Sequence, residues 1–157
     1  RETRLRGTRV KDRDFYEDSD PTKWRLAIRV VAMPADTNFY GDVFGGWVMS
    51  QADMAGGTVA IQVARGRVAT VAVKTFRFLA PVLVGDLVDL YARLEEVGNT
   101  SMTVGVRARR ESDPDSREQV AQARITYVAV GADGRPRAVQ APADSTHEHQ
   151  SLHPRRD

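Results

Sequence analysis

The chain has 157 residues, 41% of them hydrophobic and 28% charged, and it contains no cysteine. This length fits one domain with a sizeable core, and the missing cysteines exclude a disulfide framework, a thiol nucleophile and cysteine-ligated metal centres, which fits a cytoplasmic protein. The net charge of +2 is too small to predict nucleic-acid binding, and no apolar run is long enough to predict a membrane span.

Composition divides the chain into three parts. Residues 1–23 are rich in charge and poor in apolar anchors, so we expect a charged N-terminal arm. Residues 24–139 carry the periodic apolar patterns of a folded domain, and residues 140–157 form a polar tail that we expect to be flexible.

Within the domain, residue patterns predict one strand, one long helix and then four strands. The first strand is expected over Trp24–Met33 and ends before Pro34, and turn-forming residues predict a loop over Pro34–Asp42. An apolar segment of helix length, without one clean stripe, follows from about Gly46 to Ala64, so we expect a helix buried on most faces. A helix on a mostly antiparallel sheet makes the fold class α+β.

The four later strands are separated by glycine, proline and polar turn residues. We expect a polar loop at Glu111–Arg117 and strands over Val68–Val73 with Thr75–Phe78, Asp86–Val97, Ser101–Arg110 and Gln119–Val130.

The helix contains a single acidic residue, Asp53. A carboxylate is costly to bury unless it is paired or used, so Asp53 is a candidate general base or nucleophile. The alternative is that Asp53 lies on an exposed stripe or bonds to nearby backbone. The glycines of the Gly56–Gly57 pair destabilise a helix by roughly 1 kcal/mol each relative to alanine, which predicts close approach of another backbone or a ligand.

Two further features adjoin the start of the helix. Gly45 and Gly46 lie where unpaired amides and the positive end of the helix dipole can hold an anion or polarise a carbonyl, although two glycines can also simply permit a tight turn. Asn38, in the preceding loop, could orient a water or a carbonyl with its amide, or it could form an Asx turn.

Other patterns indicate little chemistry. His147, His149 and His153 all lie in the polar tail, so no metal site is expected there. Without a histidine in the domain, Ser50 is not part of a Ser-His-Asp triad. The glycine-rich patterns of dinucleotide and P-loop sites are absent, so no cofactor is expected.

Several motifs in order resemble the short bacterial acyl-CoA thioesterases of the YciA type, hotdog-fold proteins related to the brain acyl-CoA hydrolases. The resemblance spans about residues 27–130 and rests on MPADTNFYGDVFGGWVMSQAD (Met33–Asp53), GRVATVAV (Gly66–Val73), PVLVGD (Pro81–Asp86) and VGNTSM (Val97–Met102). It implies a long central helix wrapped by a curved antiparallel sheet of about five strands. It also implies subunits that pair into dimers and then into trimers of dimers.

The resemblance implies hydrolysis of acyl-CoA to free coenzyme A and a carboxylic acid, without a metal or cofactor. Asp53 would be the catalytic acid residue, acting with Asn38 from across the dimer interface, and the amides of Gly45 and Gly46 would polarise the thioester carbonyl. The implied coenzyme A contacts are Thr70, Val71, Ala72, Asn99, Thr100 and Ser101, with Arg67 as a phosphate contact unless it is a solvated surface residue.

Two other functions remain open at this point. A non-catalytic regulator could bind acyl-CoA with most of the same residues. A hotdog hydratase or dehydratase is disfavoured, because such enzymes typically pair a carboxylate with a histidine and the domain has none.

Overall fold

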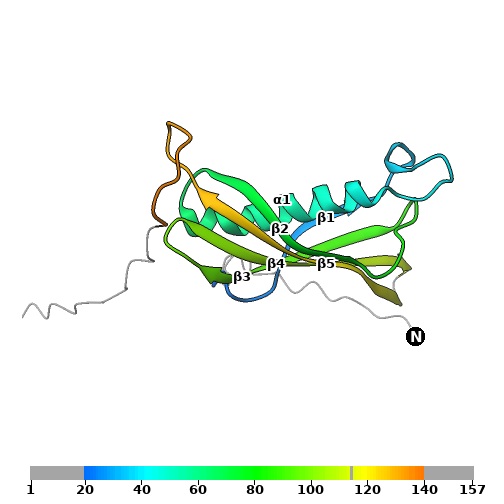
Figure 1. The fold of residues 1–157 in the computed structure, drawn as a ribbon. Helices are drawn as coiled ribbons and strands as arrows, with labels where there is room; N and C mark the ends of the chain where they lie inside the picture. Colours follow the sequence, from blue (N-terminus) through cyan, green and yellow to red (C-terminus); the bar gives the residue numbers. More distant parts are fainter. Residues whose placement is uncertain (1–19, 114, 140–157) are drawn as a thin grey trace, which may run out of the picture.

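The computed structural model describes residues 20–113 and 115–139, in which one long helix lies along one face of a five-stranded sheet (Figure 1). The helix is α1 (Gly45–Ala64), and a short 3-10 helix, η2 (Pro34–Asp36), precedes it. The strands are β1 (Arg25–Val31), β2 (Val68–Phe78), β3 (Leu87–Val97), β4 (Ser101–Asp113) and β5 (Ser116–Ala129). They run in the order β1-β3-β4-β5-β2, and every neighbouring pair is antiparallel.

This arrangement confirms the α+β class and the predicted order of strand, helix and four strands. The predicted loop at Glu111–Arg117 is wrong, because β4 continues to Asp113 and β5 begins at Ser116. Charges of opposite sign face each other here: Arg117 lies 3.2 Å from Glu111, and Arg110 lies 2.8 Å from Glu118. Such cross-strand pairs favour strands in a polar, exposed sequence.

The predicted arm and tail lie mostly outside the described residues. The described end of the arm, residues 20–23, runs beside β3, where the backbone N–H of Leu94 donates to the Pro21 carbonyl over 2.7 Å. Within the described residues, no helix combines the length and the apolar character needed to cross a membrane.

The core lies between α1 and the sheet, and the helix side of it is made of small residues. The buried residues of α1 are Val48, Ala52, Ala55, Gly56, Val59, Ala60 and Ala64. They pack against larger buried side chains of the sheet such as Leu90, Val104 and Ile125. Short side chains on one surface allow the backbone of the helix to lie close to the strands.

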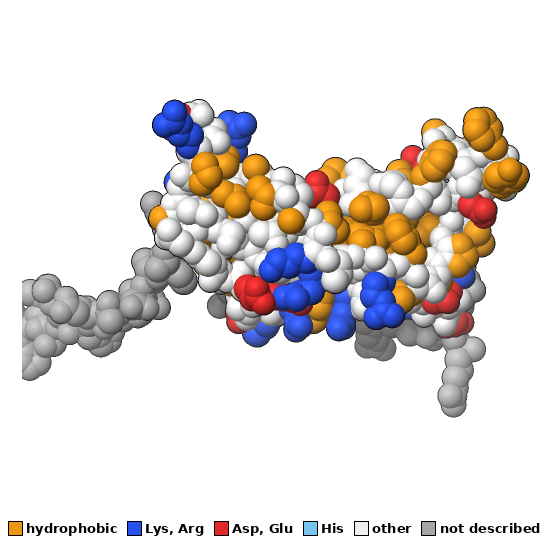
Figure 2. Space-filling model, viewed as in Figure 1, with side chains coloured by type: hydrophobic (Ala, Val, Ile, Leu, Met, Phe, Trp, Pro, Cys, Tyr) orange, Lys and Arg blue, Asp and Glu red, His pale blue; other side chains and the backbone are white. Residues whose placement is uncertain are grey.

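The opposite face of α1 is exposed in the single chain, and it carries large apolar side chains beside polar ones such as Thr58 and Gln62. Met49, Met54 and Ile61 have exposed fractions of 37%, 49% and 51%. The expectation of a helix buried on most faces is therefore wrong for one chain, which buries only the face toward the sheet. Figure 2 shows hydrophobic side chains gathered along the upper part of the molecule, where α1 and β2 lie, and at the tip of the loop before α1.

The middle of α1 packs against Tyr127 of β5 at Gly56, where the Tyr127 hydroxyl takes the place of a side chain. A Cβ atom at Gly56 would overlap that hydroxyl and lie 3.2 Å from two ring carbons of Tyr127. A Cβ atom at Gly57 would meet only Cε1 of the ring, at an ordinary 3.9 Å. The group that approaches Gly56 is thus a side chain, and not the backbone or ligand that the sequence predicts.

We predict that Gly56→Ala lowers stability, although alanine is the better helix former. Overpacking of this kind costs about 1–3 kcal/mol, more than the ~1 kcal/mol that alanine gains over glycine in a helix. Gly57→Ala is the matched control and should be neutral or stabilising. Adding Tyr127→Phe to Gly56→Ala should restore part of the loss, because it removes the closest atom.

Thermal and urea unfolding at one fixed protein concentration measure these differences. Equal stability of the Gly56→Ala and Gly57→Ala proteins would contradict the packing described for Tyr127.

Candidate active site

Asp53 lies near the middle of α1, half-buried between the helix and the sheet. The hydroxyl of Thr70 in β2 donates to its Oδ1 over 2.8 Å. The hydroxyl of Tyr127 lies 2.7 Å from the Asp53 backbone carbonyl oxygen and 3.2 Å from Oδ1. No described residue donates a hydrogen bond to Oδ2. Asp53 is therefore held by side chains from two strands while one carboxylate oxygen stays available.

Tyr127 acts only as a donor in this contact. It is 1% exposed, and this burial, reinforced by the Asp53 carboxylate, raises the pKa of its hydroxyl above the usual range. Nothing in the sequence singles out Tyr127. It is separated from Asp53 by 74 positions, and it occupies an inward-facing position in the alternating pattern of a strand, as any core residue does.

The start of α1 presents unpaired amides. Phe44 is the N-cap, and no side chain caps this end of the helix. The amides of Trp47 and Val48 donate to the Phe44 carbonyl, whereas those of Gly45 and Gly46 donate to no described residue. A Cβ atom at Gly46 would meet nothing within 4 Å. Such an end attracts an anion or a polarised carbonyl oxygen.

Asn38 forms an Asx turn, which is one of the two roles that the sequence suggests for it. Its Oδ1 accepts the backbone N–H groups of Tyr40, over 2.9 Å, and Asp42, over 3.1 Å. These bonds occupy the acceptor end of the amide and fix which end faces outward. No described residue accepts from the side-chain NH₂ group, so Asn38 can still act on a ligand as a donor.

Within one chain these groups are not brought together around a single point. Asp53 lies eight positions after Gly45, which separates the two by ~12 Å along a helix that rises about 1.5 Å per residue. No hydrogen bond joins Asn38 to Asp53 in the described residues. One thioester carbonyl could not contact Asp53 and the helix start of the same chain.

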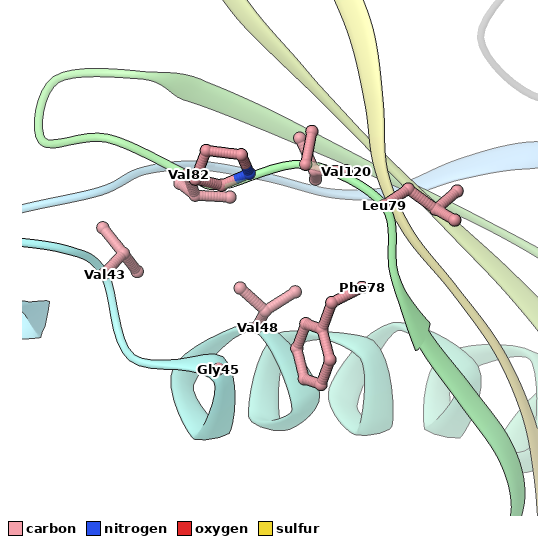
Figure 3. Close-up of a pocket in the computed structure, with 9 residues that line it drawn as sticks. Val43, Gly45, Val48, Phe78, Leu79, Val82 and Val120 are labelled. Carbon is pink, nitrogen blue, oxygen red and sulfur yellow. The ribbon is translucent and has the colours of Figure 1, made fainter.

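An apolar pocket of about 390 Å³ adjoins the start of α1 (Figure 3). Its walls come from the loop before α1, the first turn of α1, the end of β2 with the segment after it, and β5. The lining residues are Val43, Gly45, Val48, Phe78, Leu79, Ala80, Pro81, Val82 and Val120. Sequence patterns show each of these segments separately, but not that they enclose a common space.

A basic pocket of about 430 Å³ lies at the other end of α1, lined in part by Arg65, Arg67 and Arg137. Arg65 ends the helix in the left-handed conformation, with φ of 50°. The guanidinium of Arg137 donates to the carbonyls of Ala64, over 2.8 Å, and Val130, over 3.2 Å, so it satisfies acceptors at the helix end. None of the three arginines forms a salt bridge with a described residue.

The predicted coenzyme A contacts fall into two groups. Thr70, Val71 and Ala72 lie in the edge strand β2, where Thr70 already bonds to Asp53. The turn Asn99–Ser101 lies near the basic pocket, because the Thr100 carbonyl accepts the N–H of Ala129 and the Arg67 carbonyl accepts that of Val130. The structure thus brings Arg67 and this turn to one end of the molecule.

A metal centre is not evident in the part of the chain that the structure describes, where no three histidine, cysteine or acidic side chains cluster suitably. The three histidines of the predicted tail lie outside the described residues.

The thioesterase superfamily model matches residues 40–116. The acyl-CoA thioester hydrolase YciA of Escherichia coli is 46% identical over 118 residues, which cover 73% of this chain and 89% of that protein. The chain belongs to the YciA-type acyl-CoA thioester hydrolases. The family resemblance that the motifs indicate is therefore confirmed.

Solved structures of related thioesterases have the same fold. A hexameric thioesterase from Yersinia pestis aligns with a TM-score of 0.73 and 44% identity, covering 75% of this chain and 97% of that one. A hexameric hotdog fold thioesterase of Campylobacter jejuni aligns with a TM-score of 0.70 and 37% identity, covering 73% and 90%. The predicted hotdog fold is thus confirmed, while the roles of individual residues in this YciA-type protein stay predictions.

Proposed function

We propose that this protein hydrolyses acyl-CoA thioesters to free coenzyme A and a carboxylic acid. The observation that carries the proposal is the order of features along α1. An apolar pocket lies at its start, the held carboxylate of Asp53 in its middle and an arginine pocket at its end. An acyl-CoA molecule has the same order of parts: an apolar chain, a thioester and, beyond the pantetheine arm, phosphates. Relatives named acyl-CoA thioester hydrolases support the assignment.

In the proposed reaction, Asp53 Oδ2 takes a proton from a water molecule as the water oxygen attacks the thioester carbonyl. The amides at the start of α1 donate to the oxygen that becomes negative. The carbon–sulfur bond then breaks, and the proton held by Asp53 passes to the departing thiolate. Direct attack by Asp53, followed by hydrolysis of the mixed anhydride, uses the same groups. Neither route requires a metal or cofactor.

Asn38 is assigned the role of a donor to the water or to the carbonyl. Its Oδ1 is already occupied by the Tyr40 and Asp42 amides, so only its NH₂ group can contact the reactants. We place it in the site of a partner chain, because it makes no contact with Asp53 in its own chain.

The complete site is proposed to form between two chains. In a two-fold dimer with antiparallel helices, the start of each α1 would lie beside Asp53 of the other chain, which makes two identical sites. The single chain leaves surfaces suited to such pairing: the exposed face of α1 with Met54 and Ile61, and the edge strand β2 with Val71 and Val73. We propose further assembly of these dimers into a trimer of dimers, and the hexameric relatives support it.

We predict that Asp53→Asn abolishes thiol release from acyl-CoA, lowering kcat by at least about 100-fold while acyl-CoA binding persists. The measurement is a thiol-release assay over a series of acyl lengths, with binding followed in parallel by calorimetry. A folded Asp53→Asn protein with wild-type activity would refute the assignment. Binding without thiol release by the wild-type protein would favour the non-catalytic regulator.

We predict that an Asn38→Asp protein and an Asp53→Ala protein, each inactive alone, recover activity when co-expressed. Asn38→Asp keeps the acceptor of the Asx turn but removes the donor, so the loop should stay intact. With random pairing, half of the dimers are mixed and each has one intact site, which gives about a quarter of wild-type activity. A site within one chain would give no recovery in the same assay.

We predict that replacing Arg65 and Arg67 by glutamine raises KM for acyl-CoA by about 10-fold but leaves KM for acyl-pantetheine unchanged. Acyl-pantetheine lacks the nucleotide phosphates, and the difference should shrink at high salt because the arginines are at the surface. Arg109→Gln, at an exposed arginine in β4 and away from the edge strand, is the control. Equal changes in KM for both substrates would place the phosphates elsewhere.

A further inference from the structure

The contacts around Asp53 are unequal between its two carboxylate oxygens. Thr70 donates to Oδ1 from β2, and the Tyr127 hydroxyl lies within 3.2 Å of the same atom from β5. Oδ2 has no donor among the described residues. A carboxylate rotates about its terminal bond with little preference for one angle, so contacts from two sides of one oxygen determine where the other oxygen points.

The approach of Tyr127 requires a gap in the helix, and Gly56 supplies it. The hydroxyl of a buried tyrosine needs a partner, and here the partner is the Asp53 backbone carbonyl, 2.7 Å away. That bond fixes the hydroxyl beside the carboxylate of the same residue. Any residue other than glycine at position 56 would displace it. Gly56, Thr70 and Tyr127 therefore together determine the position of the Asp53 side chain.

We propose that Tyr127 and Thr70 are positioning residues that hold Oδ1 of Asp53 so that Oδ2 faces the reacting water. This inference rests on the proposed function, because it assigns a purpose to the orientation of Asp53 in that reaction. It assigns the Thr70 hydroxyl to Asp53 and not to coenzyme A. It therefore predicts that the two hydroxyl groups affect the chemical step and leave substrate binding alone. Tyr127 remains a donor across the neutral range, because burial raises the pKa of its hydroxyl.

The test removes each hydroxyl separately and compares kcat with KM. Tyr127→Phe and Thr70→Val should each lower kcat by on the order of 10-fold, which corresponds to about 1.4 kcal/mol, with KM changed by less than about twofold. Thr70→Ser keeps the hydroxyl and should restore most of kcat. Tyr91→Phe is the matched control, because its hydroxyl bonds to no described residue, and it should keep wild-type kcat.

Combination with Asp53→Asn shows whether the effect passes through Asp53. If Tyr127 acts by positioning, Tyr127→Phe should cause no further loss in the Asp53→Asn protein. A further loss of the same factor would overturn the proposal, as would wild-type kcat in both Tyr127→Phe and Thr70→Val. A purely structural role would instead lower stability without the split between kcat and KM.

A measurement independent of activity separates this inference from the proposed function. The carbon-13 signal of the Asp53 side-chain carboxyl group, assigned by its absence in Asp53→Asn, should shift in Tyr127→Phe and in Thr70→Val but not in Tyr91→Phe. Unshifted signals would overturn the positioning role even for an active enzyme. An inactive wild-type protein would reject the proposed function, and the carboxyl signals would still decide whether the hydroxyl groups hold Asp53.

Discussion

The candidate site depends on how closely α1 lies on the sheet. Alanine and glycine residues on the buried face of the helix keep its backbone near the strands, and this closeness lets the Tyr127 hydroxyl reach the Asp53 carbonyl over 2.7 Å. The same closeness brings Asp53 within 2.8 Å of Thr70 in β2. A larger side chain at Gly56 would separate helix and strand. The packing of the helix and the position of the Asp53 carboxylate therefore depend on the same contact.

The helix also orders the charges of the molecule. Its start offers unpaired amides beside an apolar pocket, and its end offers carbonyls that Arg137 satisfies. A cation at the C-terminal end complements the helix dipole, and one arginine is enough for that purpose. Arg65 and Arg67 add positive charge that no described acidic residue neutralises. Stability of the helix does not account for this surplus, whereas the proposed binding of the coenzyme A phosphates would.

The sequence predicts local features of the fold well and spatial ones poorly. Apolar periodicity gives the order of elements, and a lone carboxylate in an apolar segment singles out Asp53. The sequence does not predict that the strands include residues 111–113 and 116–117, because the pairing of Arg117 with Glu111 is visible only once the register is known. The sequence does not predict the role of Tyr127 or the two pockets either, because each depends on segments that are far apart in the chain.

The exposed face of α1 shows why the fold of one chain is not the whole mechanism. Burying Met54 and Ile61 against a second chain would remove apolar surface from water, at about 25 cal/mol per Å². The same contact would bring a helix start to each Asp53, across the ~12 Å that one helix cannot bridge by itself. It would also exclude bulk water, which strengthens the hydrogen bonds that stabilise a developing oxyanion. Assembly and catalysis would then share a single surface, so a substitution that weakens the pairing should reduce activity even where Asp53 and its two hydroxyl partners are intact.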